Sequence, residues 1–499
     1  MRTTRTRTTA HGATGGPRAP LARTGAVGGL AVCTATVVLA LVPPATAEPA
    51  DPGRPRYSAG SDGTGDPYFP LAGNGGYDVQ HYDLDLTYIP PAAAPAPLEG
   101  RLEGTATIEL VTTQGLDRFN LDLRGLTATS VEVDGKPARF TQEGTNELVV
   151  TPRPKLEDGD EAEVVVTYGG TTRRPTDVSG ALYGWVTTRD GAMVANEADG
   201  AATWFPVNDH PTDKATFSFD VTVPEGLVAV ANGLLADRTT VDGWTTWSWD
   251  APDLMAPYLA TATIGNFQLR ASAAGDVPVI DALDRDLPAA GRTTSEGTLG
   301  LTPDMMTFFE GIYGPYPFVA YGSIVDDDTV GYALETQTRS LFSRVASEST
   351  AAHELAHSWV GNAVSPERWA DIWLNEGWAA YSEQLWTEHR NGATTEQRFD
   401  ALMARPASDP FWDVVIADPG PVDMFAEAVY DRGAGTLHAL RLKIGDGAFY
   451  ELADEWVARH DDGTASTADF EALAEEVSGQ DLESFFTVWL HTAGRPTSW

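Results

Sequence analysis

Two histidines and one glutamate are spaced to bind a metal ion in this 499-residue chain. His353 and His357 stand four residues apart, so on a helix they project from the same face, one turn apart. Glu376 follows after eighteen intervening residues, at the start of a second apolar helix. Two imidazoles and one carboxylate leave a fourth position open, as catalytic zinc sites require. We therefore expect one Zn²⁺ per chain, although an isolated HExxH string also occurs in helices that bind no metal.

Two further glutamates belong to the same expected site. Glu354 lies beside a ligand histidine and is placed to accept a proton from water that the metal has acidified to a pKa of about 7. It can then return this proton to the leaving amine. Glu383 is seven residues beyond Glu376, which is two turns along the same helical face. It is either an acceptor for the second nitrogen of a ligand histidine or an ordinary exposed glutamate.

The spacing of apolar residues changes about halfway along the chain. Apolar and polar residues alternate up to about residue 270, which predicts strands with one buried face, and helical spacing dominates beyond it. We therefore predict a multidomain fold, β then mainly α. An antiparallel β domain is expected over residues 71–270 and a mostly helical catalytic domain over 271–499. Strand-like patterns at 323–325 and 333–339 precede the metal-binding helix.

Residues 1–47 are typical of a signal peptide. They contain five arginines and no acid, an apolar run, and the small residues Ala45 and Ala47 at a cleavage site. An uncleaved membrane anchor is the alternative. The only cysteine, Cys33, lies in this run after a valine, which argues against lipidation. We expect a secreted, cysteine-free mature chain that begins with a flexible linker rich in proline and glycine, over residues 48–70.

The mature chain is strongly acidic. Removal of the leader leaves 28 basic against 71 acidic residues, a net charge of −43. Such a field repels nucleic acid and anionic membrane surfaces, so we expect no nucleic-acid partner and no stable membrane association once the leader is cleaved. The run Asp326–Asp328 is interpreted as a solvated acidic face rather than a calcium site.

The segment His353–Glu383, HELAHSWVGNAVSPERWADIWLNEGWAAYSE, resembles the zinc segment of the aminopeptidase N family of gluzincins. The thermolysin family shares the ligand set but typically has one more residue in the gap. The resemblance extends over nearly all of the mature chain. It implies a saddle-like β domain followed by a thermolysin-like α/β catalytic domain.

A second motif of that family resembles Tyr332–Thr336. The family's Gly-Ala-Met-Glu-Asn sequence aligns the substrate along its backbone and binds the free α-amine with its glutamate. The resemblance therefore implies that Ala333 and Leu334 contact the substrate and that Glu335 binds its amine. Tyr332 replaces the usual glycine, which changes the shape of the first subsite.

Two more segments complete the resemblance. Ala195–Ala198 resembles the β-domain loop that supplies a second amine-binding acid, which would be Glu197. Val429–Ala434 is similar to the family's Tyr-x-Lys-Gly motif, with arginine in place of lysine. Its tyrosine, Tyr430, would donate a hydrogen bond to the oxyanion of the tetrahedral intermediate.

Taken together, the resemblance implies a secreted zinc aminopeptidase that acts on peptides with a free N-terminus. It matches a short form that lacks the helical domain covering the active site in long members, so we expect a more open cleft. We also expect a monomer. Two alternatives stay open: a thermolysin-like endopeptidase, if Glu197 and Glu335 face away from the metal, and a peptide-binding protein without catalysis.

Overall fold

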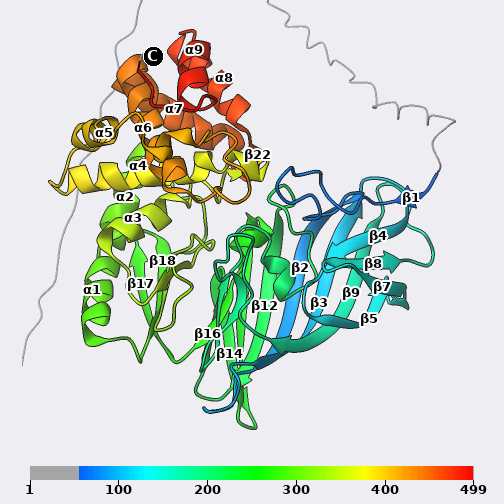
Figure 1. The fold of residues 1–499 in the computed structure, drawn as a ribbon. Coiled ribbons are helices and arrows are strands. Elements are labelled where there is room, and N and C mark those ends of the chain that lie inside the picture. Colours follow the sequence, from blue (N-terminus) through cyan, green and yellow to red (C-terminus); the bar gives the residue numbers. More distant parts are fainter. Residues whose placement is uncertain (1–55, 498–499) are drawn as a thin grey trace, which may run out of the picture. The chain divides into compact units, whose positions relative to one another are not determined.

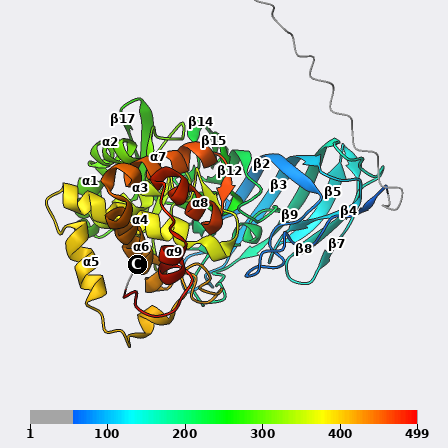
Figure 2. The same cartoon turned by 90° about the horizontal axis from the view of Figure 1, so that it is seen from above.

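The computed structural model describes residues 56–497, and these residues form one compact unit. The expected signal peptide, its cysteine and the first residues of the expected linker lie outside the described residues. β strands form the first part of the described chain and helices the last part, and the two parts lie side by side (Figures 1 and 2). None of the helices formed by residues 56–497 is long and apolar enough to cross a membrane.

An eight-stranded sheet is the largest element of the β domain (Figure 1). Its strands alternate as the sequence predicts: Leu84 and Leu86 of β2 are fully buried, while Asp83 and Asp85 between and before them are exposed. The pattern shifts by one residue near Gln80, where the register with β3 also shifts. The strand order is β14 (Leu234–Val241), β15 (Trp244–Met255), β12 (Ala215–Pro224), β2 (Tyr77–Ile89), β3 (Gly100–Thr112), β9 (Glu161–Thr172), β5 (Thr127–Val133) and β6 (Lys136–Pro137).

Two four-stranded sheets complete this domain. The first orders β1 (Ser58–Ala59), β4 (Leu116–Asp122), β8 (Glu147–Thr151) and β7 (Arg139–Glu143), and the second β10 (Gly184–Thr187), β11 (Ala192–Ala195), β16 (Ala262–Gly265) and β13 (Val228–Ala231). Most pairs are antiparallel, but β2 pairs with β12 in parallel, as β1 does with β4. Alternation identifies a strand but not the direction of its partner, so the sequence did not reveal these parallel pairs.

The catalytic domain begins with a mixed sheet of β17 (Phe267–Ala274), β18 (Val277–Asp284), β19 (Ser323–Asp326) and β20 (Ser340–Ser343). A boundary at residue 270 would cut β17, so the domains divide just before Phe267. The helices are α1 (Ala289–Leu299), α2 (Thr302–Tyr313), α3 (Glu348–Ala356), α4 (Trp373–His389), α5 (Thr395–Met403), α6 (Glu427–Ile444), α7 (Asp446–His460), α8 (Thr467–Ser478) and α9 (Glu483–Trp489), and the short strands β21 (Ser365–Pro366) and β22 (Thr464–Ala465) pair between them.

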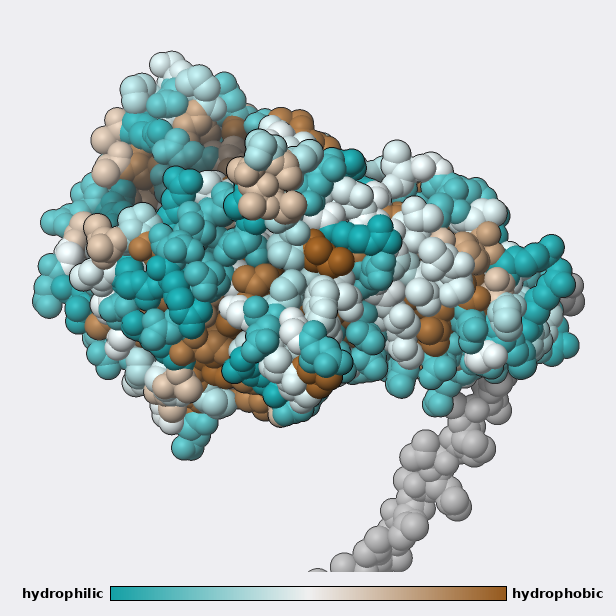
Figure 3. Space-filling model, turned by 90° about the horizontal axis from the view of Figure 1, so that it is seen from below, coloured by the Kyte–Doolittle hydropathy of each residue, from teal (hydrophilic) through white to brown (hydrophobic). Residues whose placement is uncertain are grey.

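Two local predictions for the catalytic domain differ from the structure. The stretch 333–339 is not a strand, because only Leu334 forms a bridge, with Leu341, before the chain turns into β20. Asp326 is buried at 2% exposure and accepts a hydrogen bond from the Asp328 amide, so it is not part of a solvated face. Hydrophilic residues nevertheless dominate the face drawn in Figure 3, where hydrophobic residues form small separate patches.

Residues 56–70 pack against the β domain and the catalytic domain instead of forming a linker. Asp66 is 3% exposed, and its Oδ2 accepts the amide of Trp369, which lies just before α4. Its Oδ1 accepts the amides of Tyr68 and Phe69, and the Nε2 of His210 lies 3.6 Å from Oδ2. Proline and glycine content predicted flexibility here, but one buried carboxylate with distant partners fixes the segment.

Asp66→Ala should lower the free energy of unfolding by about 3 kcal/mol, because one buried and two partly buried amides lose their acceptor. Urea unfolding followed by circular dichroism measures this change. Asp62→Ala is the matched control, since Asp62 is exposed in the same segment. Equal stability of the two variants would show that residues 56–70 are a linker after all.

Candidate active site

Helices α3 and α4 bring His353, His357 and Glu376 together. The Oε2 atom of Glu376 lies 3.2 Å from Nε2 of His353 and 3.7 Å from Nε2 of His357. One atom from each residue lies within 4.8 Å of the other two. Two imidazole nitrogens and a carboxylate oxygen converging in this way match the ligand types and number of a catalytic zinc site. The donor set therefore fits zinc.

The second ring nitrogens of the two histidines have different surroundings. Nδ1 of His357 donates to the carbonyl of Val360 at 3.0 Å, which leaves Nε2 with its lone pair for a metal. Nδ1 of His353 lies 3.9 Å from Oε2 of Glu383, which is too far for a hydrogen bond. Glu383 instead accepts the hydroxyl of Ser349. Its role as an acceptor for a ligand histidine stays a prediction.

A close crossing of α4 and α6 places Tyr430 over the metal ligands. A Cβ added to Gly433 would lie 2.7 Å from Cα of Gly377, so both helices need glycine where they cross. These glycines belong to the two motifs that carry Glu376 and Tyr430. The ring of Tyr430 stacks on His353 with centroids 6.0 Å apart. Since α6 begins at Glu427, Tyr430 stands in its first turn rather than before the helix.

Glu197 and Glu335 lie beside the same ligands. An oxygen of each lies within 4.8 Å of the other and of an oxygen of Glu376. Both side chains are buried, and their Oε1 atoms have no hydrogen-bond partner. Glu197 follows β11 of the β domain, whereas Glu335 precedes β20 of the catalytic domain. Two unpartnered carboxylate oxygens facing one cavity provide acceptors for a cationic group of a ligand.

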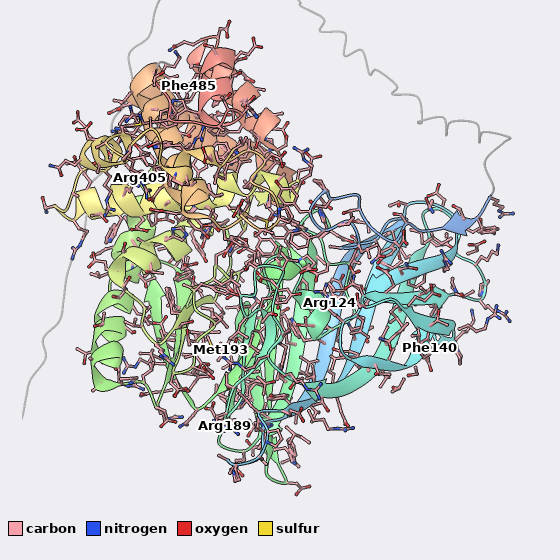
Figure 4. The ribbon with its side chains drawn as sticks, in the orientation of Figure 1. Arg124, Phe140, Arg189, Met193, Arg405 and Phe485 are labelled. Atoms are coloured by element: carbon pink, nitrogen blue, oxygen red, sulfur yellow. The ribbon has the colours of Figure 1, made fainter. Side chains whose placement is uncertain are left out.

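Nearby hydrogen bonds hold these two acids in place. The Asn362 side chain donates to the carbonyl of Glu335 at 2.8 Å. Arg124, labelled in Figure 4, forms a 2.6 Å ion pair with Asp199, two residues after Glu197. The backbone of Glu335 is thus held directly, and the loop that carries Glu197 is held through Asp199.

The two residues before Glu335, Ala333 and Leu334, have different surroundings. Ala333 lines the cavity, as expected. Leu334 is 2% exposed and belongs to the core, and both its amide and its carbonyl bond to Leu341. Its side chain and amide are therefore not available to a substrate, contrary to the expectation.

The cavity above the ligands has a volume of about 470 Å³. Several residues that line the cavity were not predicted from the sequence. They come from a distant hairpin, from α3, and from the segment that leads into α6: Asp177, Ser179, Ala181, Thr350, Phe425 and Glu427. No local motif marks them. Their proximity depends on tertiary contacts that spacing does not encode.

The electrostatics of the cavity favour bound cations. Burial raises the pKa of Glu354 well above its usual value, and repulsion from Glu376 and Glu383 adds to this effect. Burial likewise raises the pKa of Glu197 and Glu335, with repulsion from neighbouring carboxylates next. Burial lowers the pKa of His357 to about 4, which keeps it neutral and able to bind metal. A bound metal ion would make the clustered carboxylates favourable instead of costly, because its positive charge would outweigh their mutual repulsion.

Sequence comparisons agree with this geometry. Residues 78–259 match the profile of the peptidase M1 N-terminal domain, and residues 327–489 match that of the peptidase family M1 domain. The chain is similar to aminopeptidase M1-C of Oryza sativa subsp. japonica, at 27% identity over 62% of this chain and 38% of that protein. It is also similar to leucyl aminopeptidase of Saccharolobus solfataricus, at 24% identity over 80% of this chain and 52% of that protein. The chain thus spans about half the length of these relatives, or less.

Structural comparison finds a relative of similar length. A mutant M1 zinc metallopeptidase from Deinococcus radiodurans, solved with a Tyr-Ser-Ala substrate, is 30% identical with a TM-score of 0.78. The match covers 87% of this chain and 98% of that one. The predicted fold class, a β domain followed by a mostly helical catalytic domain, is confirmed.

His353→Gln should abolish tight zinc binding, because it removes one of three ligands from a site that has no spare imidazole. Atomic absorption after dialysis against a weak chelator measures the metal, with one zinc per chain expected for the unaltered protein. His389→Gln is the control, since His389 lies on the exposed end of α4. Full zinc retention by the His353 variant would exclude this ligand set.

Proposed function

Since the chain belongs to peptidase family M1, we propose that it is a zinc-dependent aminopeptidase that removes residues from the N-terminus of peptides. The observation that carries this proposal is the position of Glu197 and Glu335. Both are buried, and both lie within 4.8 Å of the metal ligand Glu376. The Deinococcus radiodurans relative, whose bound substrate is a tripeptide, supports peptides as the substrate class.

The two acids set which bond is cut. Their carboxylates bind the α-ammonium of the substrate through charge-assisted hydrogen bonds. Because the ammonium is one residue from the first peptide bond, its position places that bond over the three ligand residues. A peptide without a free amine would leave two buried carboxylates without a cation, and this cost excludes internal cleavage.

His353, His357 and Glu376 would hold the zinc ion, which supplies Lewis acidity that polarises the substrate carbonyl and makes water a stronger acid. Glu354 accepts the proton of the attacking water and delivers it to the leaving amine. The hydroxyl of Tyr430, beside His353, donates to the oxygen that becomes negative.

Free and N-acetylated forms of one peptide test this function directly. The free peptide should lose its first residue, and the acetylated peptide should be cleaved at least about a hundredfold more slowly, because acetylation removes the ammonium charge. Mass spectrometry identifies the products. Internal cleavage of both forms would instead indicate a thermolysin-like endopeptidase, and binding without cleavage would indicate a peptide-binding protein.

Glu354→Gln should lower kcat by about a thousandfold and leave one zinc per chain, because the amide keeps the shape but cannot accept the proton. Steady-state kinetics and metal analysis together measure both effects. Glu367→Gln is the matched control, since Glu367 is exposed in the same domain. Retained activity in the Glu354 variant would exclude its role as general base.

A further inference from the structure

A tight hairpin from the β domain forms one wall of the active-site cavity. It lies between β9 and β10, and a bridge between Thr176 and Leu182 closes it. Oδ1 of Asp177 accepts the amide and hydroxyl of Ser179 and the amide of Ala181, each at 2.8 Å. These bonds use one oxygen of the carboxylate. Oδ2 of Asp177 accepts no hydrogen bond from any described residue, while Asp177 itself lines the cavity.

The hairpin is fixed to the segment that carries Glu335. The hydroxyl of Tyr332 donates to the carbonyl of Leu182 at 2.7 Å. On the other side of the hairpin, Arg174 pairs with Asp328 at 3.1 Å and donates to the carbonyl of Thr329. Two attachments at its two ends hold the hairpin, so the carboxylate of Asp177 has a defined position relative to the cavity.

Asp177 lies on the side of the cavity where the substrate amine binds. Tyr332 lines the cavity together with Asp177, Glu197 and Glu335, and its hydroxyl donates to the Leu182 carbonyl of the hairpin. The α-ammonium and the first side chain of a peptide leave the same carbon atom. A side chain that starts beside Glu197 and Glu335 therefore begins close to the wall that carries Asp177.

Among the acidic residues that line the cavity, Asp177 has no cationic partner in the described part of the chain. None of the residues that line the cavity is a lysine or arginine. Glu354 and Glu376 serve the metal chemistry, and Glu197 and Glu335 serve the amine. Of the three remaining acids, Glu427 is paired through both oxygens with Arg405, which is labelled in Figure 4, at 2.9 and 3.1 Å.

The last two acids differ in their surroundings. Glu383 accepts the Ser349 hydroxyl with one oxygen and faces the His353 ring with the other. Of the three remaining acids, Asp177 alone keeps an oxygen that faces no cation or imidazole of the described residues. Phe425 and Ala181, which also line the cavity, provide apolar surface for a methylene chain.

We propose that Asp177 gives this site a preference for a cationic first residue, lysine or arginine, whose charge pairs with its free Oδ2. The inference rests on the aminopeptidase function proposed above and specifies its substrate class. Asp177 would contact the side chain of the substrate and not its reacting atoms. It therefore takes no part in hydrolysis itself.

The test compares two peptides that differ only in charge at the first position, arginine against citrulline. The zinc-loaded protein should show a kcat/KM at least about tenfold higher for the arginine peptide at low ionic strength, and salt should reduce this ratio. Asp177→Asn should bring the ratio to within about twofold of one. The asparagine keeps the oxygen that accepts the bonds from Ser179 and Ala181, and zinc content checks that the variant folds.

Asp276→Asn is the matched control, because it removes the same charge from an exposed position in the turn between β17 and β18, outside the cavity. The ratio should stay as in the unaltered protein. Equal rates for both peptides, an unchanged ratio in the Asp177 variant, or an equal fall in the Asp276 variant would each overturn the inference. Cleavage of neither peptide would overturn the proposed function together with it.

Discussion

Repulsion among buried carboxylates is the constraint on which this structure depends. Glu197, Glu335, Glu354 and Glu376 are each less than a tenth exposed, and they surround one cavity. Burial, together with repulsion from neighbouring carboxylates, raises the pKa values of Glu197, Glu335 and Glu354 and would favour their neutral forms. A metal ion at the histidines and an ammonium at the outer pair would resolve this conflict. The same repulsion that makes the empty cluster costly therefore selects ligands with positive charge.

This arrangement requires that two domains keep a fixed relation, because Glu197 comes from one and the other three acids from the other. The segment 361–363, just after the metal-binding helix, is where they are joined. Lys214 of the β domain donates to the carbonyls of Asn362 and Ala363, both at 2.9 Å, and Tyr258 donates to Gly361 at 3.0 Å. Asn362 in turn donates to the backbone of Glu335. One short segment thus links the helix that carries His353, the β domain and the backbone of Glu335.

Local spacing explains much of what the sequence could predict. The two histidines follow from a spacing of one helical turn, and Glu376 follows from the motif that opens the next apolar helix. The alternating strands were predictable for the same reason. Failures occurred where partners are distant in sequence. Residues 333–339 alternate like a strand but turn to present Glu335, and 56–70 look flexible but are fixed by Asp66 and Trp369, which are 303 residues apart.

Departures from a family motif are informative when the structure shows what the new side chain contacts. Tyr332 stands where the family has glycine, and its hydroxyl reaches the hairpin that no motif marks. Arg432 stands where the family has lysine, and its guanidinium donates to the carbonyls of Trp489, Val414 and Thr492. A lysine has its three donors on one nitrogen and could not span acceptors in the two separate segments 412–414 and 488–492. Arg432 thus fixes the helix on which Tyr430 stands, so this substitution strengthens the support of the site and leaves its chemistry unchanged.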